Sequence, residues 1–374
     1  MKQRMTVAFG VACALILGLC DGAAADDPEF HIGVVASLSG GFAIAAKDSI
    51  DGLRAWAKNR GLPGRKIVFD TLDDETNPVS AANAFRRLAS DPKTILITLL
   101  IPSNSALAVK QFASEYKVPI ISGGGADTLG VPADSWLFKV SPANRDYMVA
   151  LSQYMKKKGY TKLASLNSTD AFGRYDISNL RQLAPKYGYT IVVQESFAVE
   201  DTNFTAQLAR IRAANPDLIY SSASGRASIL FYKQFKQMGV TTPLVVTGAA
   251  ISKPFFDAIG GADKANDVMT SVQLGVFGTK VGGDTARLYG ELEKAVGHTP
   301  AYFNCFGYDV GLITEAAVKN SDGTRQGIRN AMEKLKDLPG VNGPVSYSPT
   351  DHTGQDYHSV AIGKMEHGVA MPAD

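Results

Sequence analysis

The chain has 374 residues, with 38 Lys and Arg against 36 Asp and Glu, which gives a formal net charge of +2 at pH 7. A balance this close to neutral argues against nucleic acid as a partner, because nucleic-acid-binding proteins carry a strongly basic face. Single hydrophobic cores stop growing at about 250 to 300 residues, so the length predicts two domains.

The first 25 residues are typical of a secretory signal peptide. Two basic residues precede an apolar run over residues 7–19, and an Ala triplet at 23–25 supplies the cleavage site. The run is too short to span a bilayer, and the bulky Leu19 before Cys20 argues against a lipid anchor. We expect cleavage after the triplet and a periplasmic protein.

From residue 31, short β-branched runs alternate with amphipathic stretches, a pattern typical of an α/β fold. A first series predicts strands at 31–36, 66–70, 94–100 and 118–122. The helices expected between them end at Gly61, run from an Asn77 cap through Ala89, and cover 104–116.

A second series repeats this pattern. It predicts strands at 162–166, 190–195, 217–221 and 244–247, and helices ending near 187 and covering 204–213 and 226–238. Two similar parallel series predict two lobes, and the cleft between lobes is the default ligand site. Helices at 285–296, 302–320 and 324–335 are expected to return to the first lobe.

The domain division follows from these returns. We expect connections between the lobes near 140–145, 273–278 and 347–353. The first lobe would hold 26–142 plus 277–346, and the second 143–276 plus 347–374.

A glycine-rich turn follows the fourth strand of the first series, where Ser122 precedes Gly123, Gly124 and Gly125. A dinucleotide fingerprint would need a further glycine where Thr128 stands, so that interpretation is weak. Bare N–H groups of such a turn can bind an anion, or the glycines can simply form the turn.

Signatures of catalysis are missing from the sequence. It contains no G-x-S-x-G, G-x-x-x-x-G-K-[ST] or H-E-x-x-H motif. The five histidines are scattered, and one cysteine, Cys305, is left after cleavage, so neither a metal site nor an intrachain disulfide is predicted. Turn and cap roles account for the Asp73-Asp74 pair. We expect no cofactor, no metal and no enzymatic activity.

Several segments, in this order and spacing, resemble the type I periplasmic solute-binding proteins of ABC importers, in particular the leucine/isoleucine/valine-binding branch. They are 32–40, Asp73-Asp74 with Asn77-Pro78 and Ala81-Ala82, 118–122, 170–173, 201–204 with 215–217, and 307–310. The resemblance covers nearly all of the chain after the signal peptide. It implies two Rossmann-like lobes with parallel sheets joined by a three-strand hinge. It also implies a monomer that closes over a small molecule and delivers it to inner-membrane ABC permease subunits.

The resemblance also implies an anion site in the cleft. In this family the glycine turn, here Gly124, Gly125 and Ala126, holds the ligand's carboxylate together with a serine-rich loop. That loop corresponds to Ser103, Asn104 and Ser105, and the helix that follows adds its positive N-terminal dipole. An ordinary N-cap is the alternative role for Ser103.

Two departures from the family pattern concern the ligand's amine. Amino-acid binders usually place a glutamate where this chain has Ala249, and a hydroxyl where it has Ala126. A buried ammonium without a counter-charge costs several kcal/mol. An α-amino acid is therefore a poor candidate unless another acid substitutes.

The other expected contacts are apolar or basic. Phe42 follows the first cleft loop, and Phe172 occupies the position where the family stacks an aromatic ring on its ligand. Arg226, directly after Ser224 and Gly225, could pair with a carboxylate or be a solvated helix residue, and Arg145 is a weaker candidate. These features predict an aromatic or otherwise apolar carboxylic acid, such as a benzoate-like compound.

Three alternatives stay open at this level. The first keeps the class and changes the ligand to a hydrophobic amino acid or an amide. The second is a secreted α/β enzyme that works in the same cleft. The third is a sensor subunit that signals to a membrane receptor.

Overall fold

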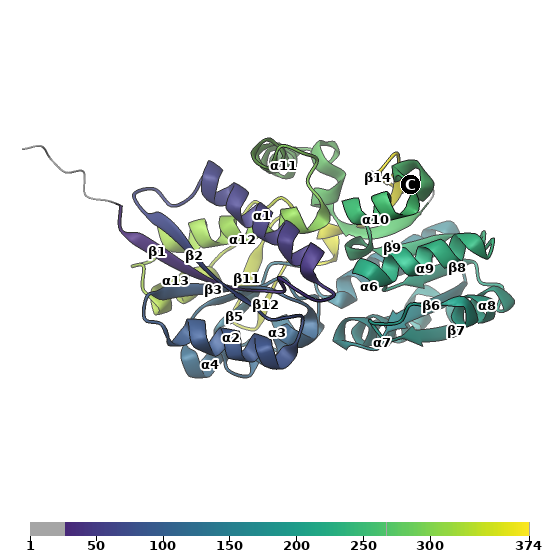
Figure 1. The fold of residues 1–374 in the computed structure, drawn as a ribbon, viewed down its shortest axis with the longest axis horizontal. Helices are drawn as coiled ribbons and strands as arrows, with labels where there is room; N and C mark the ends of the chain where they lie inside the picture. The colour runs from purple at the N-terminus through teal and green to yellow at the C-terminus, as the bar shows by residue number, and fades with distance from the viewer. Residues whose placement is uncertain (1–26, 267, 374) are drawn as a thin grey trace, which may run out of the picture.

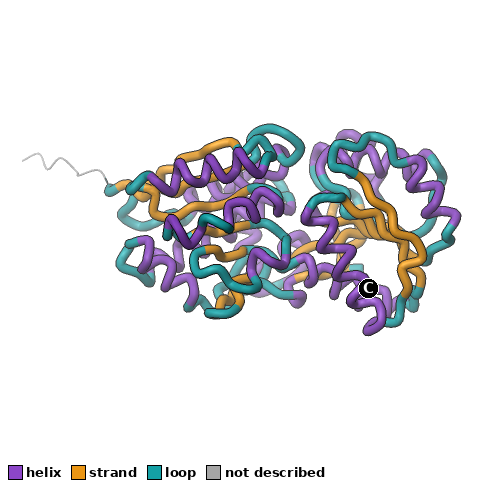
Figure 2. Tube along the Cα trace, turned by 90° about the horizontal axis from the view of Figure 1, so that it is seen from below, coloured by secondary structure: helices purple, strands orange, loops and turns teal. Residues whose placement is uncertain are grey.

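The computed structural model describes residues 27–266 and 268–373. The predicted signal peptide lies outside these ranges. Two lobes stand side by side along the long axis of the molecule (Figures 1 and 2). Within the described ranges, no helix combines the length and apolarity needed to cross a membrane.

The first lobe is built on a sheet of five parallel strands in the order β2-β1-β3-β4-β5. The strands are β1 (Glu29–Ala36), β2 (Lys66–Asp73), β3 (Thr94–Leu100), β4 (Ile120–Ser122) and β5 (Leu137–Lys139). Most side chains of β1 and β3 are buried, as expected for strands covered on both faces.

Helices cover both faces of this sheet (Figure 1). On one face lie α1 (Ala43–Asn59), α11 (Gly283–Val296) and α12 (Tyr302–Lys319), and on the other α2 (Pro78–Ser90), α3 (Ser103–Lys110) and α4 (Ala113–Tyr116). Asn77 caps α2 as predicted, since its side chain accepts from the amides of Val79 and Ser80. The single helix predicted over 104–116 is two helices, because the chain turns at Gln111–Phe112.

The second lobe repeats the winding of the first. Its sheet has the order β14-β13-β10-β9-β8-β6-β7, in which the first five strands in the chain are parallel, β13 is antiparallel to β10, and β14 is antiparallel to β13. The strands are β6 (Lys162–Ser168), β7 (Thr190–Phe197), β8 (Leu218–Ser221), β9 (Leu244–Thr247), β10 (Met269–Gln273), β13 (Val360–Glu366) and β14 (Val369–Pro372). The sequence patterns missed β5, β10, β13 and β14.

Helices of the second lobe flank this sheet. They are α6 (Asn144–Lys158), α7 (Ala171–Tyr187), α8 (Thr205–Ala213), α9 (Gly225–Gln237) and α10 (Lys253–Ile259). The pattern did not predict α6. Asp170 caps α7 by accepting from the Gly173 amide, and Gly188 ends it in the left-handed conformation.

The chain crosses between the lobes three times. The first crossing lies between β5 and α6, and the second passes through the 3₁₀ segment Leu274–Val281 before α11 packs on α1. The two-stranded ribbon of β11 (Ser346–Ser348) and β12 (Asp351–Gly354) packs against β5 and the short helix α5 (Asp127–Gly130) of the first lobe.

One predicted boundary needs correction at this ribbon. Residues 347–354, which the sequence assigned to the second lobe, lie with the first: the Tyr347 hydroxyl donates to the carbonyl of Lys139, and its ring packs edge-on against Phe138. We propose that the third crossing lies at about 355–359. There the side chain of Gln355 accepts a hydrogen bond from Gln273, the last residue of β10, directly before the second crossing.

Candidate functional site: a closed cavity between two sheets

The site lies where the carboxyl ends of both sheets face each other. In an open α/β sheet, ligands bind outside these ends at the point where the strand order reverses, which here lies between β1 and β3 and between β6 and β8. The segments after β1, β3, β4, β6, β7, β8 and β9, together with the start of α12, carry most of the residues that line a cavity of about 190 Å³. Its size and position suit a small molecule held by both lobes.

The lobes touch beside this cavity. Two hydrogen bonds join α5 to α7: Asn179 Nδ2 donates to Asp127 Oδ2 at 2.7 Å, and the hydroxyls of Thr128 and Tyr175 are 2.5 Å apart. The lobes also approach each other at Gly225, where an added Cβ would lie 3.0 Å from the carbonyl oxygen of Gly41. The two lobes are therefore in direct contact on either side of the cavity.

On the first lobe, α3 begins at the cavity without a side-chain cap. Its N-cap residue is Pro102, which offers no hydroxyl, so the alternative role of Ser103 as an ordinary N-cap is wrong. The amides of the first helical turn have no partners within the helix, and the macrodipole adds partial positive charge there. Ser103 and Asn104 both line the cavity. This helix end can bind an anion.

The glycine turn lies beside this helix end. Gly123, Gly124 and Gly125 all line the cavity. A Cβ on Gly125 would lie 3.1 Å from Asn144 Oδ1 and 3.3 Å from the Phe172 ring, so the absent side chain lets the second lobe close on the turn. A Cβ on Gly124 would instead meet Leu129 at 2.6 Å, so packing of the core explains that glycine.

Two predicted residues of this region lie outside the cavity lining. Ser105 and Ala126 are fully buried. Ser105 is the third residue of α3, which turns its side chain away from the cavity. Ala126 donates its amide to the hydroxyl of Ser103 at 3.1 Å, so that group is unavailable to a ligand.

The remaining predicted residues divide between the cavity and the surface. Phe42, Phe172, Ser224, Arg226 and Ala249 line the cavity. Arg145 does not: it is exposed, and only its amide is engaged, with Asp127.

Aromatic side chains form much of the wall, and the sequence analysis missed most of them. Phe303 and Phe306 from the start of α12 stack with centroids 5.6 Å apart, and Phe42 meets Phe303 edge-on at 5.4 Å. The hydroxyls of Tyr147 and Tyr302 are 2.8 Å apart and connect α6 to α12 across the lobes. The signal was present in the Tyr302–Phe306 segment, but only the fold places the start of α12 at the cavity.

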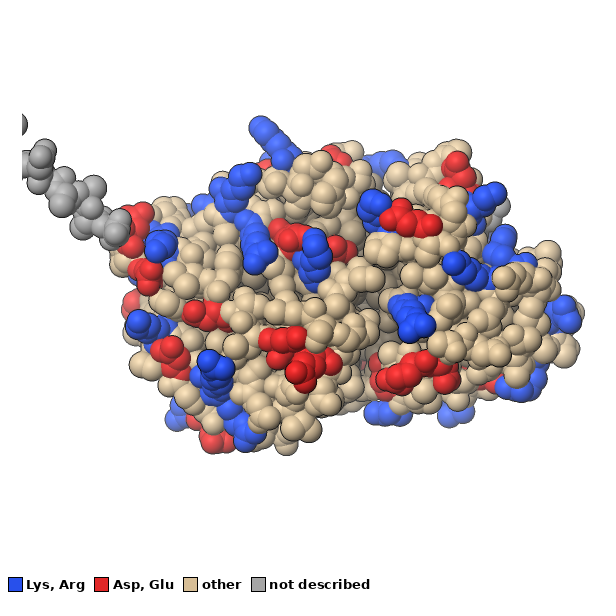
Figure 3. Space-filling model, viewed as in Figure 1, with Lys and Arg blue, Asp and Glu red and all other residues tan. Residues whose placement is uncertain are grey.

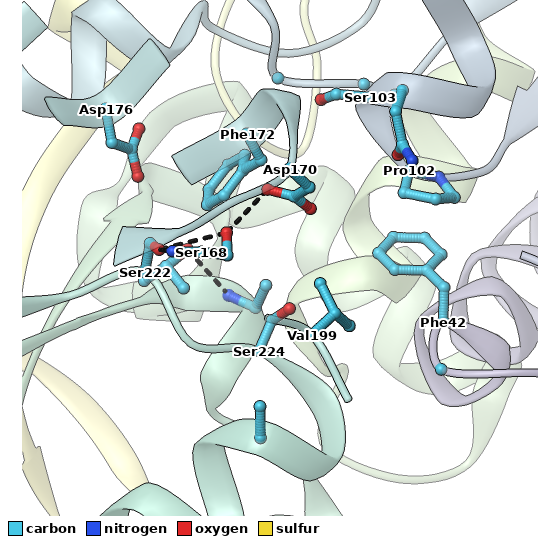
Figure 4. A pocket seen from close by; sticks show the side chains of 18 of the residues that line it. Phe42, Pro102, Ser103, Ser168, Asp170, Phe172, Asp176, Val199, Ser222 and Ser224 are labelled. Carbon is cyan, nitrogen blue, oxygen red and sulfur yellow. Dashed lines mark hydrogen bonds between the residues drawn. The ribbon is translucent and has the colours of Figure 1, made fainter. Parts of the chain in front are cut away.

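A buried acid on α7 is the main polar feature that the sequence analysis missed. Asp176 is fully buried and lines the cavity. Asn144 Nδ2 donates to its Oδ1 at 2.5 Å, and the Tyr220 hydroxyl donates to its Oδ2 at 2.6 Å. Burial raises the pKa of Asp176 to about 7, against the lowering effect of these hydrogen bonds. In the view of Figure 4, Phe172 lies between Asp176 and Ser103.

Further polar groups of the second lobe also line the cavity. The Ser168 hydroxyl donates to Asp170 Oδ1 at 2.7 Å, and the Ser168 amide donates to the Ser222 hydroxyl at 2.8 Å (Figure 4). Asp170 and the exposed Glu200 also line the cavity. In the described ranges, no group of three His, Cys, Asp or Glu residues could hold a metal ion.

Lys, Arg, Asp and Glu are scattered over both lobes on the face shown in Figure 3.

Comparison with known proteins gives a consistent result. Residues 29–368 match the family model described as periplasmic binding protein. A Leu/Ile/Val-binding protein homolog of Brucella melitensis is 23% identical over 278 residues, which cover 72% of this chain and 74% of that protein.

Solved structures share the fold. An extracellular ligand-binding receptor from Rhodopseudomonas palustris HaA2 superposes with a TM-score of 0.83 at 25% identity, over 92% of this chain and 99% of that one. A solute-binding protein of an ABC transporter from R. palustris, in complex with benzoate, gives a TM-score of 0.80 at 22% identity, over 92% and 95%.

Proposed function

We propose that this chain, which belongs to the periplasmic binding protein family, is the receptor of an ABC importer for an aromatic or otherwise apolar carboxylate. One observation carries the ligand class. One cavity combines several aromatic rings with a helix N-terminus that has no side-chain cap and with a glycine turn. The rings favour a flat apolar body, and the helix end favours a negative charge.

In this proposal the ligand's carboxylate lies at the start of α3. The first-turn amides and the Ser103 hydroxyl donate to it, and Gly125 leaves room for its approach. The ring of the ligand lies among Phe42, Phe172 and Phe303. Closure of the second lobe then removes the ligand from water, and the closed protein delivers it to the permease.

A hydrophobic amino acid is the second candidate, and Asp176 is the observation that favours it. Ala249 lies in the cavity wall where amino-acid binders place glutamate, so that position offers no counter-charge. Asp176 is a cavity acid that could pair with an ammonium in its place. Both of its oxygens already accept hydrogen bonds, however, and its raised pKa favours the neutral form near pH 7.

We propose no catalytic reaction for this site. Asp170 is engaged as the cap of α7, and Asp176 is engaged by Asn144 and Tyr220. No histidine lines the cavity within the part of the chain described, so Ser168 and Ser222 have no imidazole base.

Mass spectrometry of the small molecule released on denaturing the purified protein tests the proposed ligand class. We expect an aromatic or apolar acid, and isothermal titration of ligand-free protein should then show binding of benzoate or 3-phenylpropanoate. Release of an amino acid, together with binding of leucine and not of these acids, would overturn the ligand class and leave the solute receptor in place.

A further inference from the structure

A fully buried lysine lies directly behind the glycine turn. Lys139 is the last residue of β5 and has no exposed surface. Its ammonium donates to the carbonyl oxygens of Gly125 at 3.4 Å and Pro142 at 3.3 Å. Lys139 is not part of the cavity lining, so it cannot contact a ligand itself.

A continuous set of polar groups connects this ammonium to the cavity. The Gly125 carbonyl belongs to the same peptide group as the Ala126 amide, and that amide donates to Ser103 Oγ at 3.1 Å. Because Ser103 Oγ accepts this bond, its own proton is left for an acceptor in the cavity. Hydrogen bonds in such a chain polarise one another and strengthen in the protein interior.

The charges around Lys139 come from four elements. Asp127 of α5, Asp146 of α6 and Asp351 of β12 attract its proton, whereas Lys110 of α3 repels it. Burial outweighs the three acids and lowers the pKa of Lys139 to about 8. A buried ammonium whose close contacts are carbonyl oxygens is costly to keep charged, and a nearby anion would favour its charged form.

We propose that Lys139 is a positioning residue for anionic ligands, which polarises the Gly125–Ala126 peptide group and thereby the Ser103 hydroxyl from behind the cavity wall. This inference rests on the proposed function, in which the carboxylate of an aromatic or apolar acid lies at Ser103. In this proposal, part of the preference for anionic ligands depends on a charge that lies outside the cavity.

Titration of benzoate between pH 6.5 and 9.5 tests this role, because benzoate stays ionised throughout. We expect wild-type affinity to fall as the pH rises above about 8, where Lys139 loses its proton. Lys139→Met should bind benzoate about tenfold more weakly at pH 7, equivalent to about 1.4 kcal/mol, and show no further loss above pH 8. Lys139→Arg should retain affinity at both ends of the range, because a guanidinium stays protonated.

Asp176 also titrates in this range, so each measurement is repeated in an Asp176→Asn background, which removes its contribution. If Lys139→Met does not fold, as judged by circular dichroism, wild type and Lys139→Arg still give the comparison. Wild-type binding that is flat between pH 8 and 9.5, or Lys139→Met binding equal to wild type, would overturn the inference. Absence of any wild-type binding to benzoate and 3-phenylpropanoate would instead reject the proposed acid ligand, and this inference with it.

Discussion

The two walls of the cavity come from equivalent places in two similar sheets, yet only the second-lobe wall carries charged side chains within the described ranges, and these include Arg226 as well as acids. The first-lobe wall offers donors, with the uncapped start of α3, the glycine turn and Ser103, and it contains no acid within the described ranges. The second-lobe wall brings Asp170, Asp176 and Glu200. The repeated winding therefore places the two walls opposite each other, and the side chains make them chemically different.

The contact between these walls can be broken at Gly125, and we expect the largest effect there. Gly125→Val should weaken binding of 3-phenylpropanoate by about hundredfold, near the upper limit of the cost of overpacking, because the new side chain meets Phe172 and Asn144. Isothermal titration measures the loss. Gly290→Val is the matched control, since a Cβ at Gly290 has open space. Equal binding by both variants would show that the walls do not close as described.

Comparing 3-phenylpropanoate with phenylalanine, which differ in the ammonium group, tests whether the second-lobe wall offers a counter-charge to an amine. With alanine at position 249, we expect the acid to bind better by at least about 2 kcal/mol, or roughly thirtyfold, since the ammonium would be buried unpaired. Ala249→Glu should reduce this gap by repelling the acid and pairing with the amine. Tighter wild-type binding of phenylalanine would mean that Asp176 supplies the counter-charge.

Removing one donor from the first-lobe wall should have a smaller effect. Ser103→Ala should weaken binding of 3-phenylpropanoate by about 1 to 2 kcal/mol, the scale of one hydrogen bond to a charged group. Ser114→Ala, on the exposed side of α4, is the control. Unchanged affinity of Ser103→Ala would remove Ser103 from the anion site.

We expect the smallest effect from changing the charge of Asp176, in the second-lobe wall, with pH. Asp176 has a raised pKa of about 7, so its carboxyl is neutral below that pH and negative above it. Between pH 6 and 8, wild-type affinity for 3-phenylpropanoate should therefore fall, by about two- to fivefold for a partly screened charge. Asp176→Asn should remove the decrease centred near pH 7 and leave only the smaller decrease near pH 8 that belongs to Lys139. Affinity that rises with pH would indicate an ammonium ligand paired with Asp176.

Local patterns were sufficient for most of the elements. The predicted strand at 94–100 has the same bounds as β3, and the Asn77-Pro78 pair begins α2 where it was expected. Short strands with weak periodicity were missed, among them β5 with three residues and β14 with four. Their pairing is decided by neighbours that are distant in the sequence, which a local pattern cannot contain.

The residues of the site likewise divide into those that local sequence patterns indicate and those that depend on neighbours distant in the sequence. The glycine turn and Ser103 follow strands directly, so the sequence could place them at a sheet edge. Asp176 follows no strand; it lies within α7, where a buried acid has no local signature, and its partners Asn144 and Tyr220 come from other elements.

By itself, the sequence determined the alternation of strands and helices, the doubled series and the donors after the first-lobe strands, because each depends on side-chain periodicity or turn chemistry over a few residues. Only the tertiary structure decided that Ser105 and Ala126 lie outside the cavity, that α12 adds its rings, and that Lys139 lies behind the turn. These facts depend on which groups become buried together when two sheets face each other, and burial is a property of the whole fold.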